Sequence, residues 1–221
     1  MEFSLLDTIA LAALPVILAI TLHEAAHGYV ARKFGDSTAW MLGRVTLNPL
    51  KHIDPIGTVV VPLGILLLSG GGFLFGWAKP VPVNFGNLRH PKRDMLWVAA
   101  AGPGVNFAMA LVWALVFGLA TGGGALASAS LKYMSLIGVG INVSLMVLNL
   151  LPILPLDGGR IAVSLLPHSL AVPFARTERF GFFIVIALLA SGALGVAMRP
   201  LVNGATTLIE LLTGVDLPGG F

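Results

Sequence analysis

The sequence predicts an all-α polytopic membrane protein. Its 221 residues are 57% hydrophobic, with a mean hydropathy of +0.93. Only 10% are charged, whereas a soluble domain carries about 25% charged residues. Several apolar stretches are long enough to cross a bilayer. We expect about four to six transmembrane helices in one integral-membrane domain over residues 1–221, with a core at 1–165 and C-terminal helices within 176–213.

The charged residues and the absence of cysteine narrow the function. The net charge is +3, and the basic residues lie in the segments between the apolar runs. This pattern is typical of cytoplasmic loops in a membrane protein, so we expect the lipid bilayer as a partner and no nucleic acid. The chain has no cysteine, which excludes disulfides and thiolate metal sites.

The first apolar run, Phe3–Val30, is long enough to span the membrane. Arg32 and Lys33 follow it, so the positive-inside rule places its C-terminal end in the cytoplasm and the N-terminus outside. We do not expect a cleavable signal, because the run is preceded by Glu2 and by no basic region.

A shorter apolar run, Ile56–Trp77, is interrupted by Gly70–Gly72. Runs of this kind are often re-entrant. If it spanned the membrane, the basic residues of Lys79–Arg93 would lie outside, against the positive-inside rule. We therefore expect a re-entrant segment, with the connections Asn48–Asp54 and Lys79–Arg93 both on the cytoplasmic side.

The segment after this run alternates proline with valine. It reads Lys79, Pro80, Val81, Pro82, Val83, Asn84. Alternate prolines favour an extended, β-like segment with free edge groups. It is either a rigid connecting loop or an edge near the active site on which a substrate peptide pairs, and the sequence does not separate these two interpretations.

Two further spans come next, Met95–Ala120 and a span within Lys132–Pro155. The uncharged connection Thr121–Ser130 between them is typical of a short outside loop. Asn106 lies inside the first of these spans, and we expect it to make a hydrogen bond between helices rather than to act in catalysis.

The C-terminal part contains one more predicted span, Phe180–Met198, which we expect to end at Arg199–Pro200. A short helical piece, Leu201–Leu212, follows it. The sequence does not decide whether this piece crosses the membrane.

The main candidate site lies within the first span, in a His-Glu-x-x-His pattern. His23 and His27 are four residues apart, so a helix places both imidazoles on one face. Two such imidazoles can hold a zinc ion, and Glu24 beside them can take a proton from a water that the zinc activates. The pattern can also arise by chance. Ionisable side chains in an apolar span are costly, however, and this favours a functional site.

A third metal ligand must be a histidine or a carboxylate, since the chain has no cysteine. Asp157 follows the third span, after two prolines that end a regular helix and before two glycines that permit close backbone approach. It can be an ordinary turn aspartate at the interface. The expected topology nevertheless places it at the same membrane face as His23 and His27.

Three groups of residues together resemble the site-2 protease family, the intramembrane zinc metallopeptidases of family M50. They are the His23–His27 motif, Ala101-Gly102-Pro103-Gly104-Val105-Asn106, and the ending Asn149…Pro152…Leu156-Asp157-Gly158. The segments Asn48–Gly57 and Gly76–Asn84 resemble the short bacterial branch, without PDZ or CBS domains. The resemblance covers most of the chain, from about Leu18 to Arg160.

The resemblance implies a function and a site. His23, His27 and Asp157 would hold one Zn²⁺ per chain, and Glu24 would be the catalytic base. Asn149 would lie near the scissile peptide, and the substrate would be a transmembrane protein cut in or near its membrane segment. The active site would lie near the cytoplasmic side of a bacterial inner membrane.

The alternative is a non-proteolytic membrane protein, either a divalent-cation carrier or a scaffold that binds membrane helices. A carrier would line its path with acidic residues, yet the spans contain almost no carboxylates apart from Glu24 and Glu210. A Glu24→Gln variant separates the two functions, because a peptidase should keep zinc and lose turnover. Neither the substrate nor the oligomeric state follows from the sequence.

Overall fold

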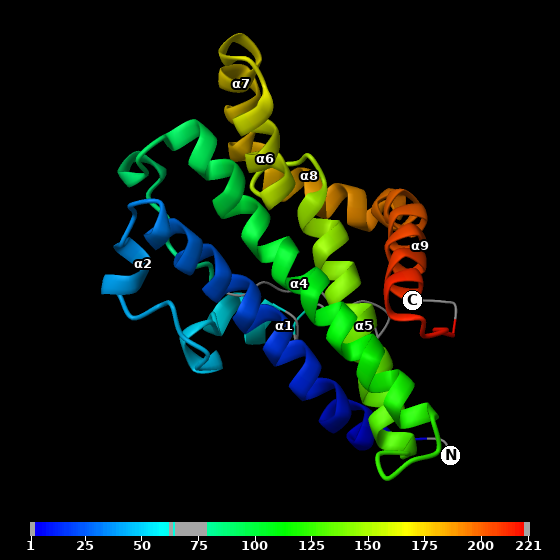
Figure 1. Cartoon of the computed structure of the whole chain (residues 1–221). Helices are drawn as coiled ribbons and strands as arrows, with labels where there is room; N and C mark the ends of the chain where they lie inside the picture. Colours follow the sequence, from blue (N-terminus) through cyan, green and yellow to red (C-terminus); the bar gives the residue numbers. More distant parts are fainter. Residues whose placement is uncertain (1–2, 62–63, 65–78, 219–221) are drawn as a thin grey trace.

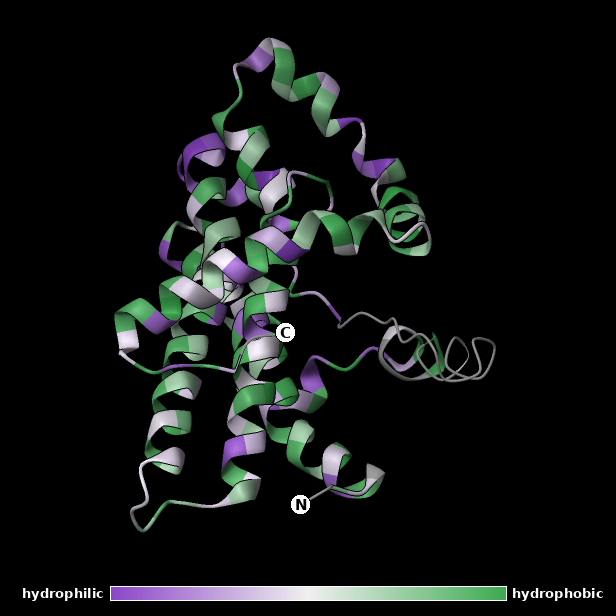
Figure 2. Ribbon diagram, turned by 90° about the vertical axis from the view of Figure 1, so that its right-hand side faces the viewer, coloured by the Kyte–Doolittle hydropathy of each residue, from purple (hydrophilic) through white to green (hydrophobic). Residues whose placement is uncertain are grey.

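Three long helices form the centre of the molecule. The computed structural model describes residues 3–61, 64 and 79–218. Within it, α1 (Leu5–Lys33), α4 (Pro91–Thr121) and α5 (Ala129–Leu150) contact one another in one bundle (Figure 1). Each is long and apolar enough to cross a membrane, and hydrophobic residues recur along all of them (Figure 2). The predicted all-α membrane fold is confirmed.

Helix α1 begins and ends as its sequence dictates. The Ser4 hydroxyl accepts a hydrogen bond from the Asp7 amide at 3.2 Å, and the Asp7 carboxylate accepts one from the Ser4 amide at 3.1 Å. This reciprocal cap satisfies two amides that have no partner within the helix. Arg32 and Lys33 lie in the last turn, where positive charge is favourable. The helix therefore presents the His-Glu-x-x-His stretch in regular α-helical geometry.

The hydrophobic core lies mainly between α4 and α5. A side chain at Gly138 of α5 would come within 2.4 Å of the Trp113 ring of α4, so the missing side chain allows the two helices to approach closely. Helix α9 (Ala193–Thr213) joins this core through Val202 and Ile209. The buried residues from the three helices are Ala110, Trp113, Ala114, Phe117, Val139, Val143, Met146, Val147, Val202 and Ile209.

The C-terminal part differs from the prediction in where its helix breaks. Helix α8 (Glu178–Ala190) ends before Gly192, and α9 leaves at 85° to it. Gly192 has φ +76°, a conformation that costs glycine little and ends a helix. The expected end at Arg199–Pro200 is therefore wrong, because Pro200 lies inside α9.

The number of spans follows from the same bend. The described residues contain three candidate spans, or four if the bent pair α8–α9 counts as one. This agrees with the lower end of the expected four to six, and nothing in the described part of the chain supports five or six.

Short elements connect these helices. They are α2 (Thr38–Met41), η1 (Pro49–Lys51), η2 (Pro55–Val60, a π-helix), η3 (Phe85–Asn87), α6 (Asp157–Leu165) and α7 (His168–Ala175). No β-strand forms within residues 3–61, 64 and 79–218, and Lys79–Asn84 has no regular secondary structure. The predicted re-entrant segment Ile56–Trp77 lies mostly outside the described residues.

Candidate metal centre

The two histidines of α1 and the first residue of α6 converge on one point. His23 Nε2 lies 3.1 Å from His27 Nε2, and Asp157 Oδ2 lies 3.3 Å and 3.4 Å from these two nitrogens. Zinc bound tetrahedrally at about 2.0–2.2 Å from each ligand separates neighbouring ligand atoms by about 3.3 Å. The observed triangle therefore has the dimensions of three zinc ligands.

Two further observations fit a zinc ion at this point. Asp157 Oδ2 is buried and makes no hydrogen bond in the described structure, although a buried carboxylate oxygen normally has a partner. Gly102 of α4 faces the same point, and a Cβ there would lie 2.5 Å from His27 Nε2 and 2.6 Å from His23 Nε2. The missing side chain keeps free the space beside the two nitrogens.

The loop after α5 brings Asp157 to the histidines. Pro152 and Pro155 end α5, and α6 begins at Asp157. A Cβ at Gly158 would lie 2.2 Å from the Leu150 carbonyl oxygen, and one at Gly159 would lie 2.5 Å from the Leu154 amide nitrogen. Only glycine permits so close a backbone approach, as the sequence predicts. The start of α6 therefore folds directly against the end of α5.

Each histidine is oriented through its second ring nitrogen. His23 Nδ1 lies 2.5 Å from Asn106 Oδ1, and His27 Nδ1 lies 2.7 Å from the Val98 carbonyl oxygen. A donated Nδ1–H leaves the Nε2 lone pair for a metal. Asn106 also donates to Asn142 of α5 at 2.9 Å, so its predicted hydrogen bond between helices is confirmed. Asn106 also orients His23, a contact that its position in the sequence does not predict.

Glu24 is hydrogen-bonded to the segment Lys79–Asn84 rather than to the candidate metal ligands. Its Oε2 accepts a hydrogen bond from the Val81 amide at 2.7 Å. Val81 is buried, and its side chain and that of Val45 pack over Gly28 of α1. The segment Lys79–Asn84 therefore lies directly beside the candidate base.

Arg44 holds this segment in place, a role that the sequence alone does not predict. The Arg44 side chain is buried, and its Nη2 donates to the carbonyl oxygens of Lys79 at 2.9 Å and Pro80 at 3.3 Å. The His52 carbonyl accepts from the Lys79 amide at 2.9 Å, so the connection around His52 also contacts the start of this segment. The signal in the sequence was weak, because arginine is also the ordinary residue of a cytoplasmic connection.

Asp36 anchors the other end of the segment. Its fully buried carboxylate accepts hydrogen bonds from the Asn84 amide at 2.7 Å, the Thr38 amide at 3.0 Å and the Asn87 side chain at 3.2 Å. Burial opposes ionisation of this carboxyl, but the hydrogen bonds outweigh burial and lower its pKa below the usual value. Asp36 is therefore ionised at neutral pH.

The predicted substrate-binding residues have different environments. Pro80 and Asn84 are exposed, whereas Pro82 and Val83 are half-buried. The Asn84 side chain accepts from the Gly86 amide at 3.0 Å and so begins η3. Asn149 donates to the Leu145 carbonyl of its own helix at 3.0 Å. Within the described structure it makes no hydrogen bond to His23, His27 or Asp157, so its role stays a prediction.

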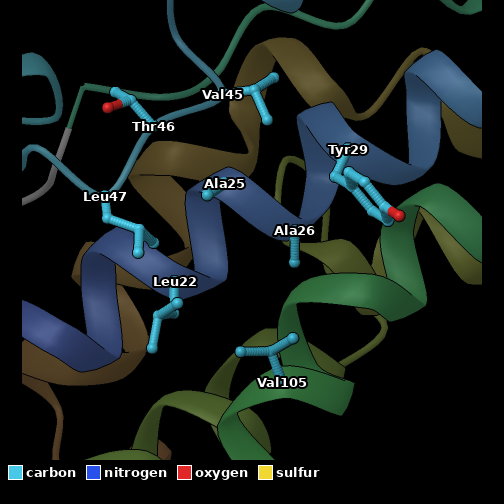
Figure 3. Close-up of a pocket in the computed structure, with 8 residues that line it drawn as sticks. All are labelled: Leu22, Ala25, Ala26, Tyr29, Val45, Thr46, Leu47 and Val105. Atoms are coloured by element: carbon cyan, nitrogen blue, oxygen red, sulfur yellow. The ribbon is translucent and has the colours of Figure 1, made fainter.

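A separate apolar groove of about 340 Å³ lies between α1, the loop at residues 45–47 and α4 (Figure 3). None of the three candidate ligands lines it, and neither does Glu24. The groove is lined by Leu22, Ala25, Ala26, Tyr29, Val45, Thr46, Leu47 and Val105.

The candidate site combines two histidines and a carboxylate with a neighbouring glutamate, which is the set of groups that a metal-dependent hydrolase uses. Because the site lies within a bundle of apolar helices, this class of protein would be embedded in a membrane. The comparison with known proteins agrees. The family model for peptidase family M50 matches residues 117–192, a range that includes Asp157 but not α1. No solved structure matches the chain significantly.

Three similar proteins come from bacteria. "Putative zinc metalloprotease YwhC" of Bacillus subtilis is 36% identical over 208 residues, which are 92% of this chain and 91% of the relative. "Putative zinc metalloprotease Rip2" of Mycolicibacterium smegmatis is 33% identical over 80% of this chain and 66% of the relative. Rip2 of Mycobacterium tuberculosis is 32% identical over 64% of this chain and 52% of its own length.

The chain belongs to the M50 family of peptidases, as its resemblance to the site-2 proteases implies. It is a zinc metallopeptidase and an integral membrane protein.

Proposed function

We propose that this zinc metallopeptidase hydrolyses peptide bonds in or near the transmembrane segments of membrane-protein substrates. In this proposal His23, His27 and Asp157 hold one zinc ion, and Glu24 is the general base. The observation that carries it is the triangle of candidate ligand atoms between α1 and α6. Its sides are 3.1 Å between the two histidine Nε2 atoms, and 3.3 and 3.4 Å from these atoms to Asp157 Oδ2.

The chemistry divides between the metal and Glu24. Bound zinc supplies Lewis acidity, which acidifies a water and polarises a substrate carbonyl. Glu24 takes the proton of the attacking water and passes it to the leaving amine. The Val81 amide at 2.7 Å from Oε2 supports this role, because it holds the carboxylate in one orientation.

A substrate helix must unwind before it is cut, since its peptide groups are hydrogen-bonded within the helix. We infer that the edge Pro80–Asn84 holds the unwound chain as an added strand, and that Asn149 contacts the scissile region. The position of Val81 beside Glu24 supports this assignment, since a peptide on that edge lies next to the base.

The active site lies near the cytoplasmic face of a bacterial inner membrane in this proposal. His27 is six residues before Lys33, or about 9 Å along the helix, and Lys33 is basic, as cytoplasmic ends of spans are. The bacterial origin of the similar proteins also supports it.

The Glu24→Gln variant tests the proposal. A neutral amide cannot accept the water's proton, so cleavage of a single-span reporter should fall on the order of 10²–10⁴-fold or more, with zinc content unchanged. The measurement is single-turnover cleavage in liposomes with zinc analysis on the same sample. Near wild-type cleavage by a zinc-loaded variant would exclude Glu24 as the base. A wild-type protein that cuts none of a range of single-span substrates would favour the cation carrier or scaffold.

A further inference from the structure

Four polar groups form a chain of hydrogen bonds across the three central helices. The chain begins at the Gly138 carbonyl of α5, which accepts from Asn142 Nδ2 at 2.8 Å. Asn142 Oδ1 accepts from Asn106 Nδ2 at 2.9 Å, and Asn106 Oδ1 lies 2.5 Å from His23 Nδ1. Asn106 and Asn142 are both 0% exposed, so no solvent competes for these hydrogen bonds.

The starting point fixes the direction of every bond in this chain. A carbonyl can only accept, so Asn142 must turn its amide nitrogen towards Gly138 and its oxygen towards Asn106. Asn106 must then point its nitrogen at Asn142 and its oxygen at His23. An oxygen facing His23 Nδ1 requires a hydrogen on that nitrogen, and the lone pair is left on Nε2, which faces the metal centre.

We propose that Asn142 is a positioning residue that fixes the tautomer and orientation of His23 through Asn106. The inference rests on the proposed role of His23 as a zinc ligand. Both histidines are then oriented in the same way, with Nδ1 donating to a hydrogen-bond acceptor. For His27 this acceptor is the Val98 backbone carbonyl. No backbone carbonyl contacts His23 Nδ1 within the described structure, and the two asparagines connect it to Gly138 instead.

Asn142 does not act alone on Asn106. Asn106 Nδ2 also donates to the Ala19 carbonyl at 3.4 Å, a longer and weaker bond than the 2.9 Å bond to Asn142. Loss of an outer partner of a metal ligand costs about 10–100-fold in metal affinity. We expect Asn142→Leu to weaken zinc binding by roughly tenfold, at the lower end of that range, because Ala19 retains part of the orientation.

The experiment measures zinc affinity by competition with a chelator, together with the visible spectrum of the Co²⁺-substituted protein. Asn142→Leu should weaken zinc binding and change the Co²⁺ spectrum. The matched control is Ser135→Ala on the same helix. Ser135 is equally buried but donates only to its own helix, to the Leu131 carbonyl at 2.6 Å, so this variant should leave both readouts unchanged.

Two further variants separate positioning from packing. Asn142→Asp keeps the oxygen that Asn106 needs, so it should bind zinc more tightly than Asn142→Leu does. The double variant Asn106→Leu/Asn142→Leu should bind zinc no more weakly than Asn106→Leu alone, because Asn142 acts on His23 only through its hydrogen bond to Asn106. Independent, additive losses would overturn the proposal, as would unchanged zinc affinity in Asn142→Leu.

His23→Ala is measured in parallel. If it keeps full zinc affinity, the proposed ligand set fails. If it loses zinc while Asn142→Leu does not, the ligand set holds and only the positioning role of Asn142 fails.

Discussion

Gly102 illustrates how a single residue can decide whether the metal centre exists. It lies on α4, yet it faces the two histidines of α1, and a methyl group there would lie within 2.6 Å of both Nε2 atoms. Contacts this short are far below van der Waals separation, and the site is buried among packed helices that cannot move apart cheaply. If the two histidines hold zinc as proposed, this position tolerates no side chain.

We therefore expect Gly102→Ala to lose at least about tenfold in zinc affinity and, with it, peptidase activity, because the methyl group takes the space beside the ligands. Gly104→Ala is the matched control. Gly104 is exposed on the same helix, and a methyl group there would meet no other segment within 4 Å. Zinc analysis of both purified proteins checks the prediction, which a zinc-replete Gly102→Ala protein would contradict.

The candidate ligands could be predicted because each has a local signal. His23 and His27 have helical spacing, and Asp157 follows a helix-ending pair of prolines. Arg44 and Asn142 could not be assigned in this way. Their roles depend on which carbonyl or amide another element places beside them, and spacing within one element does not encode that contact.

At the scale of elements, the segment Lys79–Asn84 is held by side chains rather than by a sheet. Arg44 binds its first two carbonyls, Glu24 accepts from Val81, and Asp36 accepts from Asn84. The prolines in the sequence predict an extended segment with free edge groups. They do not predict the three side chains that bond some of these groups. These anchors set the distance between the proposed substrate edge and the base.

Arg44→Met should lower cleavage without loss of zinc. Without the guanidinium, the Lys79 and Pro80 carbonyls lose their donors, and the Val81 amide shifts relative to Glu24. A displacement of about 1 Å at a catalytic group costs up to about 100-fold in rate. Single-turnover cleavage and zinc content are the measurements. Arg93→Met, at an exposed arginine of α4, should leave both unchanged. Equal activity of the two variants would remove Arg44 from the positioning of this segment.

Asp36→Asn should destabilise the same region and reduce its sensitivity to acid. Hydrogen bonds to a buried charged group contribute about 1.5–3 kcal/mol. Because folding lowers the pKa of Asp36, the stability that its charge gives to the folded protein is complete above the unfolded pKa of about 3.9. This stability is lost as pH falls through the folded pKa.

The measurement is thermal unfolding in detergent at pH 7 and at about pH 3–4. The variant should be less stable at pH 7, and the difference from wild type should shrink on acidification. A constant difference would show that the charge of Asp36 is not responsible.

The whole molecule has two unlike ends. The N-terminus and the α4–α5 turn lie at one end of the bundle, whereas α2, the start of α4, α6 and α7 lie at the other (Figure 1). Residues 122–128 of the turn carry no charge. At the opposite end, Lys92 donates to the Leu166 carbonyl at 2.5 Å, and Arg160 pairs with Glu178 at 3.1 Å. By the positive-inside rule, the end that carries the basic residues is the one we expect in the cytoplasm.

The topology can be tested directly because the chain has no cysteine. We expect Ala125→Cys, in the uncharged turn, to react with a membrane-impermeant thiol reagent in intact cells. His90→Cys, just before α4, should react only after the membrane is permeabilised. Both positions are exposed, and neither substitution adds or removes a lysine or arginine. Helix α4 has 31 residues and is about 46 Å long, so it is long enough for its two ends to lie on opposite sides of a hydrocarbon core of about 30 Å. Labelling of His90→Cys from outside would reverse the proposed orientation and place the metal centre near the outer face. Labelling of both from outside would mean that α4 does not span the membrane at all.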